Sequence, residues 1–182
     1  AATGKMLKEM PGIVENAVRF NMEADSLNCS ILGPDAGPGT EEFDLFVKEV
    51  VREMTVKAGQ KCTAIRRTLV PEGMQEAVVE ALRERLGRVK VGDPAAEGVR
   101  MGPLASREQV QDVGASTALL AGAGELVFGG NGDFEVVGAD PEKGAFFQPT
   151  LFVCDRPLEV TEPHDVEAFG PVSTVLPYDT LD

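Results

Sequence analysis

Positive charge is scarce in this chain of 182 residues. It has 17 lysines and arginines against 30 aspartates and glutamates, which gives a formal net charge of -13. A protein that binds a nucleic-acid backbone needs clustered lysine and arginine, so we expect no nucleic-acid partner. No stretch approaches the roughly 20 consecutive apolar residues of a membrane span, and no basic-then-apolar leader stands at the start. We therefore expect a soluble, cytoplasmic protein with no membrane partner.

Cysteine and histidine are also few. The three cysteines are Cys29, Cys62 and Cys154, none of them in a CxxC pair, and His164 is the single histidine. An odd number of cysteines in a domain of ordinary size argues against a disulfide framework and for a reducing compartment. A zinc site would need a set of sulfur and nitrogen ligands that these four residues do not suggest. We expect no metal.

The length fits a single domain with a real hydrophobic core. The chain has no initiating methionine and begins inside a segment with helical character. We therefore expect residues 1–182 to be one domain cut from a longer protein.

Hydrophobic periodicity predicts alternating strands and helices. Strands are predicted at 28–32, 64–70, 125–128, 134–137, 147–153 and 172–176, and helices at 41–57, 74–89 and from a capping box at 106–109 to near 122. Residues 92–104 are predicted to be loop, because glycine and proline are frequent there. Alternation through the first two thirds of the chain favours a three-layer α/β domain.

Cys62 is the most informative residue. It follows an amphipathic helix in the loop sequence Gly-Gln-Lys-Cys-Thr, where glycine lets the backbone approach a substrate and N–H groups could face an oxyanion. Free cysteine is usually a small buried hydrophobe, and we expect that role for Cys29 and Cys154, which lie in apolar strand patterns. Of the three cysteines, we expect only Cys62 to act as a nucleophile.

Glu23 and His164 are the candidate bases. A cysteine that forms a thioester needs a base to activate water, and Glu23, just before the first strand, could serve if its environment raises its pKa. Its plain alternative is a solvated carboxylate at a strand edge. His164 could instead pair with Cys62, as in thiol hydrolases, although a histidine on a surface loop is the simpler interpretation.

Glu167 and Phe169 stand just ahead of a Gly-Pro turn and a strand. A carboxylate can accept hydrogen bonds from two ribose hydroxyls. An exposed loop glutamate and a core phenylalanine are the alternatives from the residues alone.

Together these residues resemble the catalytic domain of the NAD(P)-dependent aldehyde dehydrogenases. Four landmarks occur in the family's order: Glu23 with Asn28, then Gly59–Cys62, Gly144–Phe152 and Glu167–Val172. They span nearly the whole chain. The resemblance implies a three-layer αβα catalytic domain with the dinucleotide-binding domain outside this segment.

One departure from the family pattern narrows the resemblance. The family usually has Glu-Leu-Gly-Gly-Lys-Asn around the base, whereas residues 23–28 are Glu-Ala-Asp-Ser-Leu-Asn. This variant is most similar to the dehydrogenase part of the bifunctional ring-opening protein of phenylacetate degradation, and the semialdehyde dehydrogenase of aerobic benzoyl-CoA breakdown is a related alternative. The substrate implied is an aldehyde, in particular a CoA-linked semialdehyde.

The resemblance also implies a role for each site residue. Cys62 would attack the aldehyde to form a thiohemiacetal and then a thioester, with its backbone N–H as half of the oxyanion hole. Glu23 would activate the hydrolytic water. Glu167 would hold the ribose of NAD or NADP, and Phe169 would pack beside the cofactor. The full-length parent would be a homo-oligomer, whereas the isolated segment would be inactive. A Cys/His hydrolase and a non-catalytic interaction domain remain open as alternatives.

Overall fold

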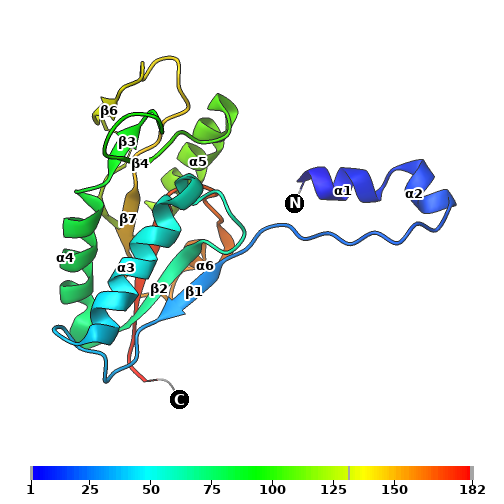
Figure 1. The fold of residues 1–182 in the computed structure, drawn as a ribbon. Coiled ribbons are helices and arrows are strands. Elements are labelled where there is room, and N and C mark those ends of the chain that lie inside the picture. Colours follow the sequence, from blue (N-terminus) through cyan, green and yellow to red (C-terminus); the bar gives the residue numbers. More distant parts are fainter. Residues whose placement is uncertain (1, 131, 181–182) are drawn as a thin grey trace.

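A five-stranded sheet forms the centre of the domain (Figure 1). The computed structural model describes residues 2–130 and 132–180. The strands lie in the order β1 (Asn28–Ile31), β2 (Ile65–Pro71), β8 (Val172–Tyr178), β7 (Thr150–Val153) and β5 (Glu125–Phe128). Neighbouring strands are parallel except for β5, which runs antiparallel to β7. The expected strands at 28–32, 64–70, 125–128 and 172–176 are thus confirmed, with ends that differ by at most two residues.

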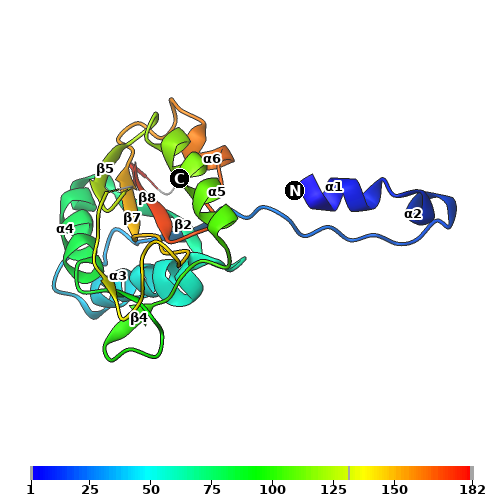
Figure 2. The same cartoon turned by 90° about the horizontal axis from the view of Figure 1, so that it is seen from above.

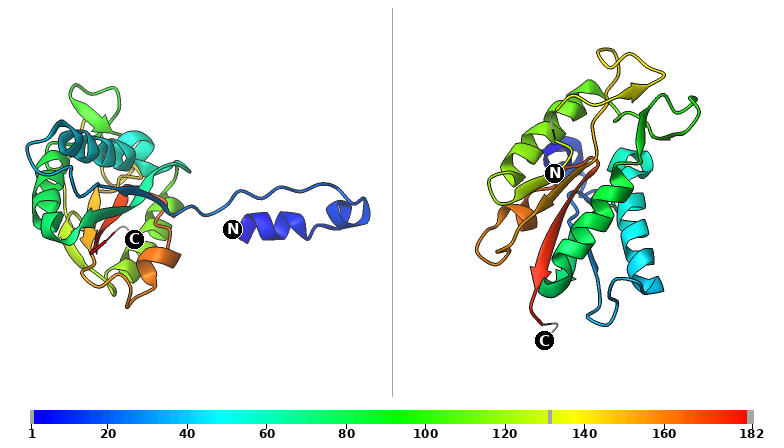
Figure 3. Two further views of the ribbon diagram at one scale, coloured as in Figure 1. Left: turned by 90° about the horizontal axis from the view of Figure 1, so that it is seen from below. Right: turned by 90° about the vertical axis from the view of Figure 1, so that its left-hand side faces the viewer.

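Helices cover both faces of this sheet, and the predicted three-layer architecture is confirmed (Figures 2 and 3). One face carries α3 (Glu41–Thr55) and α4 (Gln75–Leu86), and the other carries α5 (Arg107–Leu120) and the short α6 (Glu162–Asp165). Two 3₁₀ segments, η1 (Val56–Gly59) and η2 (Glu72–Met74), follow α3 and precede α4. Helix α3 ends at Thr55, two residues before the predicted boundary, because the backbone of Val56 is extended and that of Lys57 is left-handed.

The two faces of the sheet bury separate hydrophobic clusters. In β7, successive residues point to opposite faces: Leu151 packs in the cluster under α3 and α4, and Phe152 packs in the cluster under α5. Polar caps start two of the helices. Thr40 accepts from the Phe43 N–H at the start of α3, and Ser106 accepts from the Gln109 N–H at the start of α5, the second as the capping box predicts.

A small second sheet was not predicted, although the strand expected at 134–137 is present in it as the shorter β6. Its strands lie in the order β4 (Val99–Met101), β3 (Lys90–Gly92) and β6 (Val136–Val137). The prediction of loop at 92–104 and of helix to residue 89 was wrong here, since α4 ends at Leu86. Strands β3 and β4 have three residues each and are too short to show a period, so only their pairing partners define them. The strand predicted at 147–153 starts at Thr150, because Pro149 cannot donate to a ladder.

The N-terminal residues form an arm that projects from the body of the domain (Figure 1). It contains α1 (Ala2–Lys8) and α2 (Pro11–Glu15), and an extended segment then leads to β1. The arm exposes large apolar side chains, namely Met6, Leu7, Met10, Val14, Val18 and Met22. Within the described residues, no helix is both long enough and apolar enough to cross a membrane.

Candidate active site

Cys62 is exposed and follows an unusual turn between α3 and β2. Lys57, Ala58 and Gly59 all have positive φ, at 53°, 51° and 68°. Residues with a side chain rarely adopt this left-handed region, at a cost of order 1–3 kcal/mol each, and such strain persists only where the surroundings fix it. The turn reverses the chain at the end of α3 and presents Cys62 ahead of the sheet.

Gly59 is the point where the turn touches the segment that carries Glu167 and Phe169. A Cβ atom built on Gly59 would overlap the carbonyl group of Gly170 and lie 2.9 Å from the Met54 carbonyl oxygen. Backbone packs directly on backbone here. The contact needs glycine both for its positive φ and for its missing side chain.

We expect Gly59→Ala to lower the free energy of unfolding by about 2–4 kcal/mol, because the left-handed strain adds to the overlap with Gly170. Urea unfolding followed by circular dichroism measures the loss. Gly73→Ala is the matched control, since nothing lies within 4 Å of a Cβ at Gly73. Equal stability of the two variants would contradict the proposed close contact.

Two side chains at the start of β1 hold the backbone of Cys62: Ser26 stands two residues before the strand, and Asn28 is its first residue. Ser26 Oγ donates to the Cys62 carbonyl oxygen at 2.6 Å, and Asn28 Nδ2 donates to the same oxygen at 2.5 Å. Asn28 also reaches the Ala64 carbonyl at 3.2 Å. Within the described residues, the Cys62 N–H has no hydrogen-bond acceptor, so it is available to a substrate oxygen. The segment that carries Glu23 is therefore tied directly to the candidate nucleophile.

Lys61 anchors the other side of the nucleophile loop. Its Nζ lies 2.6 Å from Glu53 Oε2 on α3, and both side chains are about four-fifths buried. An ion pair shielded in this way is screened less by solvent than the exposed pairs of the surface. The loop is thus fixed from two directions, by the Glu23 segment and by α3.

The four residues singled out in the sequence line a single groove of about 770 Å³: Glu23, Cys62, Glu167 and Phe169. They come from the N-terminal arm, the loop before β2 and the loop before β8. Glu23 is exposed and accepts a hydrogen bond from Asn21 Nδ2 at 3.3 Å. The groove therefore brings together a thiol, a carboxylate near solvent and a second carboxylate beside an aromatic ring.

Sequence reasoning missed the contribution of α5 to this groove. Gln109, Asp112, Val113 and Ser116 line it from one face of the helix. Their spacing of three, four and seven residues was available as a signal, but a polar stripe on a helix normally faces solvent.

Gln60, next to the nucleophile loop, connects α5 to the Phe169 segment. Its side-chain amide donates to Gln109 Oε1 at 3.0 Å and to the Phe169 carbonyl at 3.1 Å, and its Oε1 accepts from the Ala105 N–H at 2.8 Å. Its partners stand up to 109 positions away in the sequence. No local pattern could have revealed this bridge.

His164 does not face the groove. It lies on α6, where a surface loop was expected, and its Nε2 is 2.8 Å from the Pro157 carbonyl oxygen. It lines a different cavity, beside Leu158 and Tyr178. The arrangement gives no geometric support to a Cys62–His164 dyad.

The other two cysteines differ from each other. Cys154 is buried as predicted, and burial raises the pKa of its thiol. Cys29 is exposed, so its prediction as a buried hydrophobe was wrong: it lies on β1, an edge strand of the sheet. Among the described residues no group of three or more histidine, cysteine or acidic side chains is arranged to hold a metal ion.

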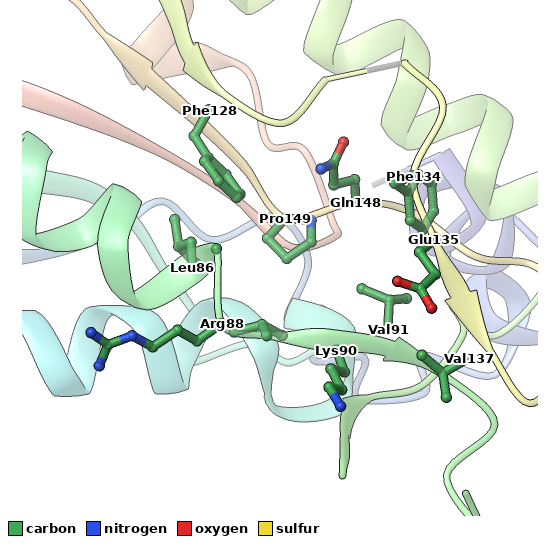
Figure 4. A pocket seen from close by; sticks show the side chains of 12 residues that line it. Leu86, Arg88, Lys90, Val91, Phe128, Phe134, Glu135, Val137, Gln148 and Pro149 are labelled. Carbon is green, nitrogen blue, oxygen red and sulfur yellow. The ribbon is translucent and has the colours of Figure 1, made fainter. Parts of the chain in front are cut away.

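Another cavity, of about 320 Å³, opens between the end of α4 and the small sheet (Figure 4). Phe128, Phe134, Val91 and Pro149 give it a largely apolar wall, and the Gln148 amide lies among them. It shares no lining residue with the groove around Cys62.

Comparison with known proteins shows what the chain is similar to. Residues 1–182 match the model of the aldehyde dehydrogenase family. Over its whole length, the chain is 54% identical to the 3,4-dehydroadipyl-CoA semialdehyde dehydrogenase of Aromatoleum evansii. The alignment covers 36% of that protein. It is 38% identical, over 76% of its length, to a putative aldehyde dehydrogenase of Staphylococcus haemolyticus, of which it covers 29%.

Among solved structures, betaine aldehyde dehydrogenase from Staphylococcus aureus in complex with NAD⁺ superposes with a TM-score of 0.82 and 26% identity. The match covers 98% of this chain and 33% of that one. The chain thus spans about a third of the length of the proteins it resembles.

Proposed function

Because the chain belongs to the aldehyde dehydrogenase family, we propose that it is the catalytic domain of a longer NAD(P)-dependent enzyme that oxidises an aldehyde to a carboxylic acid. One observation carries the proposal: Cys62, Glu23 and Glu167 open onto the same groove. The resemblance noted in the sequence is confirmed at the level of the family. The relatives extend well beyond this chain, which supports a parent protein that supplies the dinucleotide-binding domain.

The residues present fit the chemistry of a nicotinamide nucleotide. The Glu167 carboxylate can accept hydrogen bonds from ribose hydroxyls, and the Phe169 ring, 37% exposed, offers an apolar surface beside it. A nicotinamide bound there would accept a hydride. The role of the chain is to hold the ribose and to place the sulfur next to the reacting carbon.

Cys62 then performs covalent catalysis in two stages. Its thiolate attacks the aldehyde carbon, and the oxygen that becomes negative can be stabilised by the Cys62 N–H. Loss of hydride converts this thiohemiacetal into a thioester. Glu23 takes a proton from water, the resulting hydroxide attacks the thioester, and the acid leaves as the thiolate is restored.

A CoA-linked semialdehyde is the substrate class that we propose. The relative with 54% identity carries this chemistry in its name, and the departure from the family pattern at residues 23–28 points the same way. A homo-oligomeric parent and a cytoplasmic location, both expected from the resemblance, remain predictions.

The direct test is nicotinamide reduction by the full-length protein, followed by absorbance, with NAD and with NADP. Simple aldehydes and a CoA-linked semialdehyde are offered in parallel. We expect reduction that strongly favours the CoA substrate, and no appreciable reduction by the isolated 182-residue chain, which lacks most of the cofactor site. Absence of reduction with every pair of aldehyde and cofactor would contradict the proposed function. Turnover by the isolated chain would contradict the proposal that most of the cofactor site lies in another part of the parent protein.

A further inference from the structure

Arg66 is buried in the sheet four residues after Cys62. It is 5% exposed on β2, a position where a charged side chain is rare. Its Nη1 donates to the Gly170 carbonyl oxygen at 2.5 Å, and its Nη2 donates to the Gly59 carbonyl oxygen at 2.7 Å. These are the two residues whose backbones meet between the nucleophile turn and the Phe169 segment. One guanidinium thus joins both sides of that contact.

The same guanidinium lies close to the two candidate cofactor residues, Phe169 and Glu167. Its central carbon lies 5.6 Å from the centre of the Phe169 ring, within the range of a cation–π interaction. Burial lowers the pKa of Arg66, and attraction to the Glu167 carboxylate opposes this effect. Since arginine stays charged in proteins, the cation is retained beside both residues.

Simple packing does not explain an arginine here. Within the described residues, Arg66 Nε is buried without a hydrogen-bond partner, which costs stability. An apolar residue would fill a sheet interior at lower cost than an incompletely paired charge. What arginine adds is a fork of donors that can hold two carbonyl groups at once.

The next residue provides a contrast. Side chains alternate along a strand, so Arg67 leaves β2 on the opposite side from Arg66. Its Nε donates to the Leu27 carbonyl oxygen at 2.9 Å, in the segment that follows Glu23. Two consecutive arginines therefore hold two different segments, one associated with the base and one with the cofactor residues.

We propose that Arg66 is a positioning residue for cofactor binding: its buried guanidinium fixes the segment bearing Glu167 and Phe169 against the Cys62 turn. This inference rests on the proposed function. Arg66 touches neither the reacting sulfur nor the aldehyde in this arrangement. Its loss therefore weakens binding of the nicotinamide nucleotide while the intrinsic reactivity of the Cys62 thiol is retained.

The test compares Arg66→Met and Arg66→Lys with wild type in the full-length protein. Binding of NADH and of NADPH is measured by nucleotide fluorescence, and Cys62 reactivity by iodoacetamide alkylation with mass spectrometry. We expect Arg66→Met to weaken nucleotide binding about tenfold, the scale of a lost charged hydrogen bond. The lysine variant should recover part of the affinity, because one ammonium can reach one carbonyl. Alkylation of Cys62 per folded molecule should change less than about twofold, as expected for a group with no contact to Arg66.

Arg83→Met is the matched control, an arginine lost from the exposed surface of α4. The inference would be overturned if Arg66→Met bound the nucleotide as tightly as wild type. It would also be overturned if nucleotide binding and Cys62 alkylation both fell only by the fraction of the protein that is unfolded. If Arg66→Met does not fold, Arg66→Lys decides by the same criteria. If wild type binds no nucleotide at all, the proposed function itself fails; if wild type binds and the variants bind equally well, only the role of Arg66 is lost.

Discussion

Cys62→Ser in the full-length protein is expected to abolish nicotinamide reduction. The loss should be at least about 10³-fold, the scale measured when a reacting group is removed from an enzyme. A serine hydroxyl in the same place is far less acidic than a thiol, so it would not supply the anion that attacks the aldehyde carbon. The first step of the reaction, covalent attack on the aldehyde, would therefore not occur. Initial rates of NAD(P)H formation measure the effect.

Cys29→Ser is the natural control for this experiment. Both cysteines are exposed, but Cys29 lies on the edge strand β1 and does not line the groove. The Cys29 variant should keep wild-type activity and the Cys62 variant should not. Mass spectrometry of protein trapped with aldehyde and cofactor would show an adduct on Cys62 in wild type and Cys29→Ser only. Similar behaviour of the two variants would remove Cys62 from the role of nucleophile.

The same variants separate the alternative functions. A Cys62–His164 hydrolase would need no nicotinamide and would lose activity in His164→Ala, whereas His164 binds a backbone carbonyl in another cavity and should matter little. A non-catalytic interaction domain would tolerate Cys62→Ser without loss. Activity measurements on Cys62→Ser and His164→Ala therefore discriminate among all three.

The local periodicity of apolar residues predicted most of the helices and strands of the fold. The long amphipathic helices α3 and α4 follow from their apolar spacing, because each covers one face of a sheet and repeats its buried side at every turn. Strands β3 and β4 of the small sheet could not be found in this way. They are defined by pairing with partners as far as 45 positions away, as between Val91 on β3 and Val136 on β6. A strand that short has no pattern of its own.

In the candidate site, too, the local sequence indicated some residues, whereas others depend on contacts between distant segments. Cys62 could be singled out from its own loop, but nothing in the neighbourhood of Glu23 placed it near the thiol. That link depends on Ser26 and Asn28, which reach the Cys62 carbonyl across more than 30 positions. Arg66 was not singled out, because an arginine in a strand pattern normally faces solvent. Only the folded chain shows that it is buried between two loops. Long-range hydrogen bonds are therefore what the sequence alone could not supply.

Glu23→Gln is expected to separate the two halves of the reaction. Attack by Cys62 and hydride loss do not use the Glu23 carboxylate, so the first turnover should proceed. Glutamine cannot accept a proton from water, so hydrolysis of the thioester should slow by about 10²–10⁴-fold, the usual contribution of a general base. Rapid mixing should then show a burst of about one NAD(P)H per active site followed by a slow steady rate, the kinetic sign of an accumulating acyl-enzyme.

The acyl group on Cys62 is the decisive observation, because a slow steady rate alone could arise from weak binding. Intact-mass spectrometry of the quenched Glu23→Gln protein should find the thioester, and added hydroxylamine should release it. Glu15→Gln, which removes a carboxylate from α2 in the same arm but outside the groove, should show neither burst nor adduct beyond wild type. A Glu23→Gln protein that loses the burst together with the steady rate would place Glu23 in binding or in the first step, and would leave the activation of water to another group in the groove, such as Asp112.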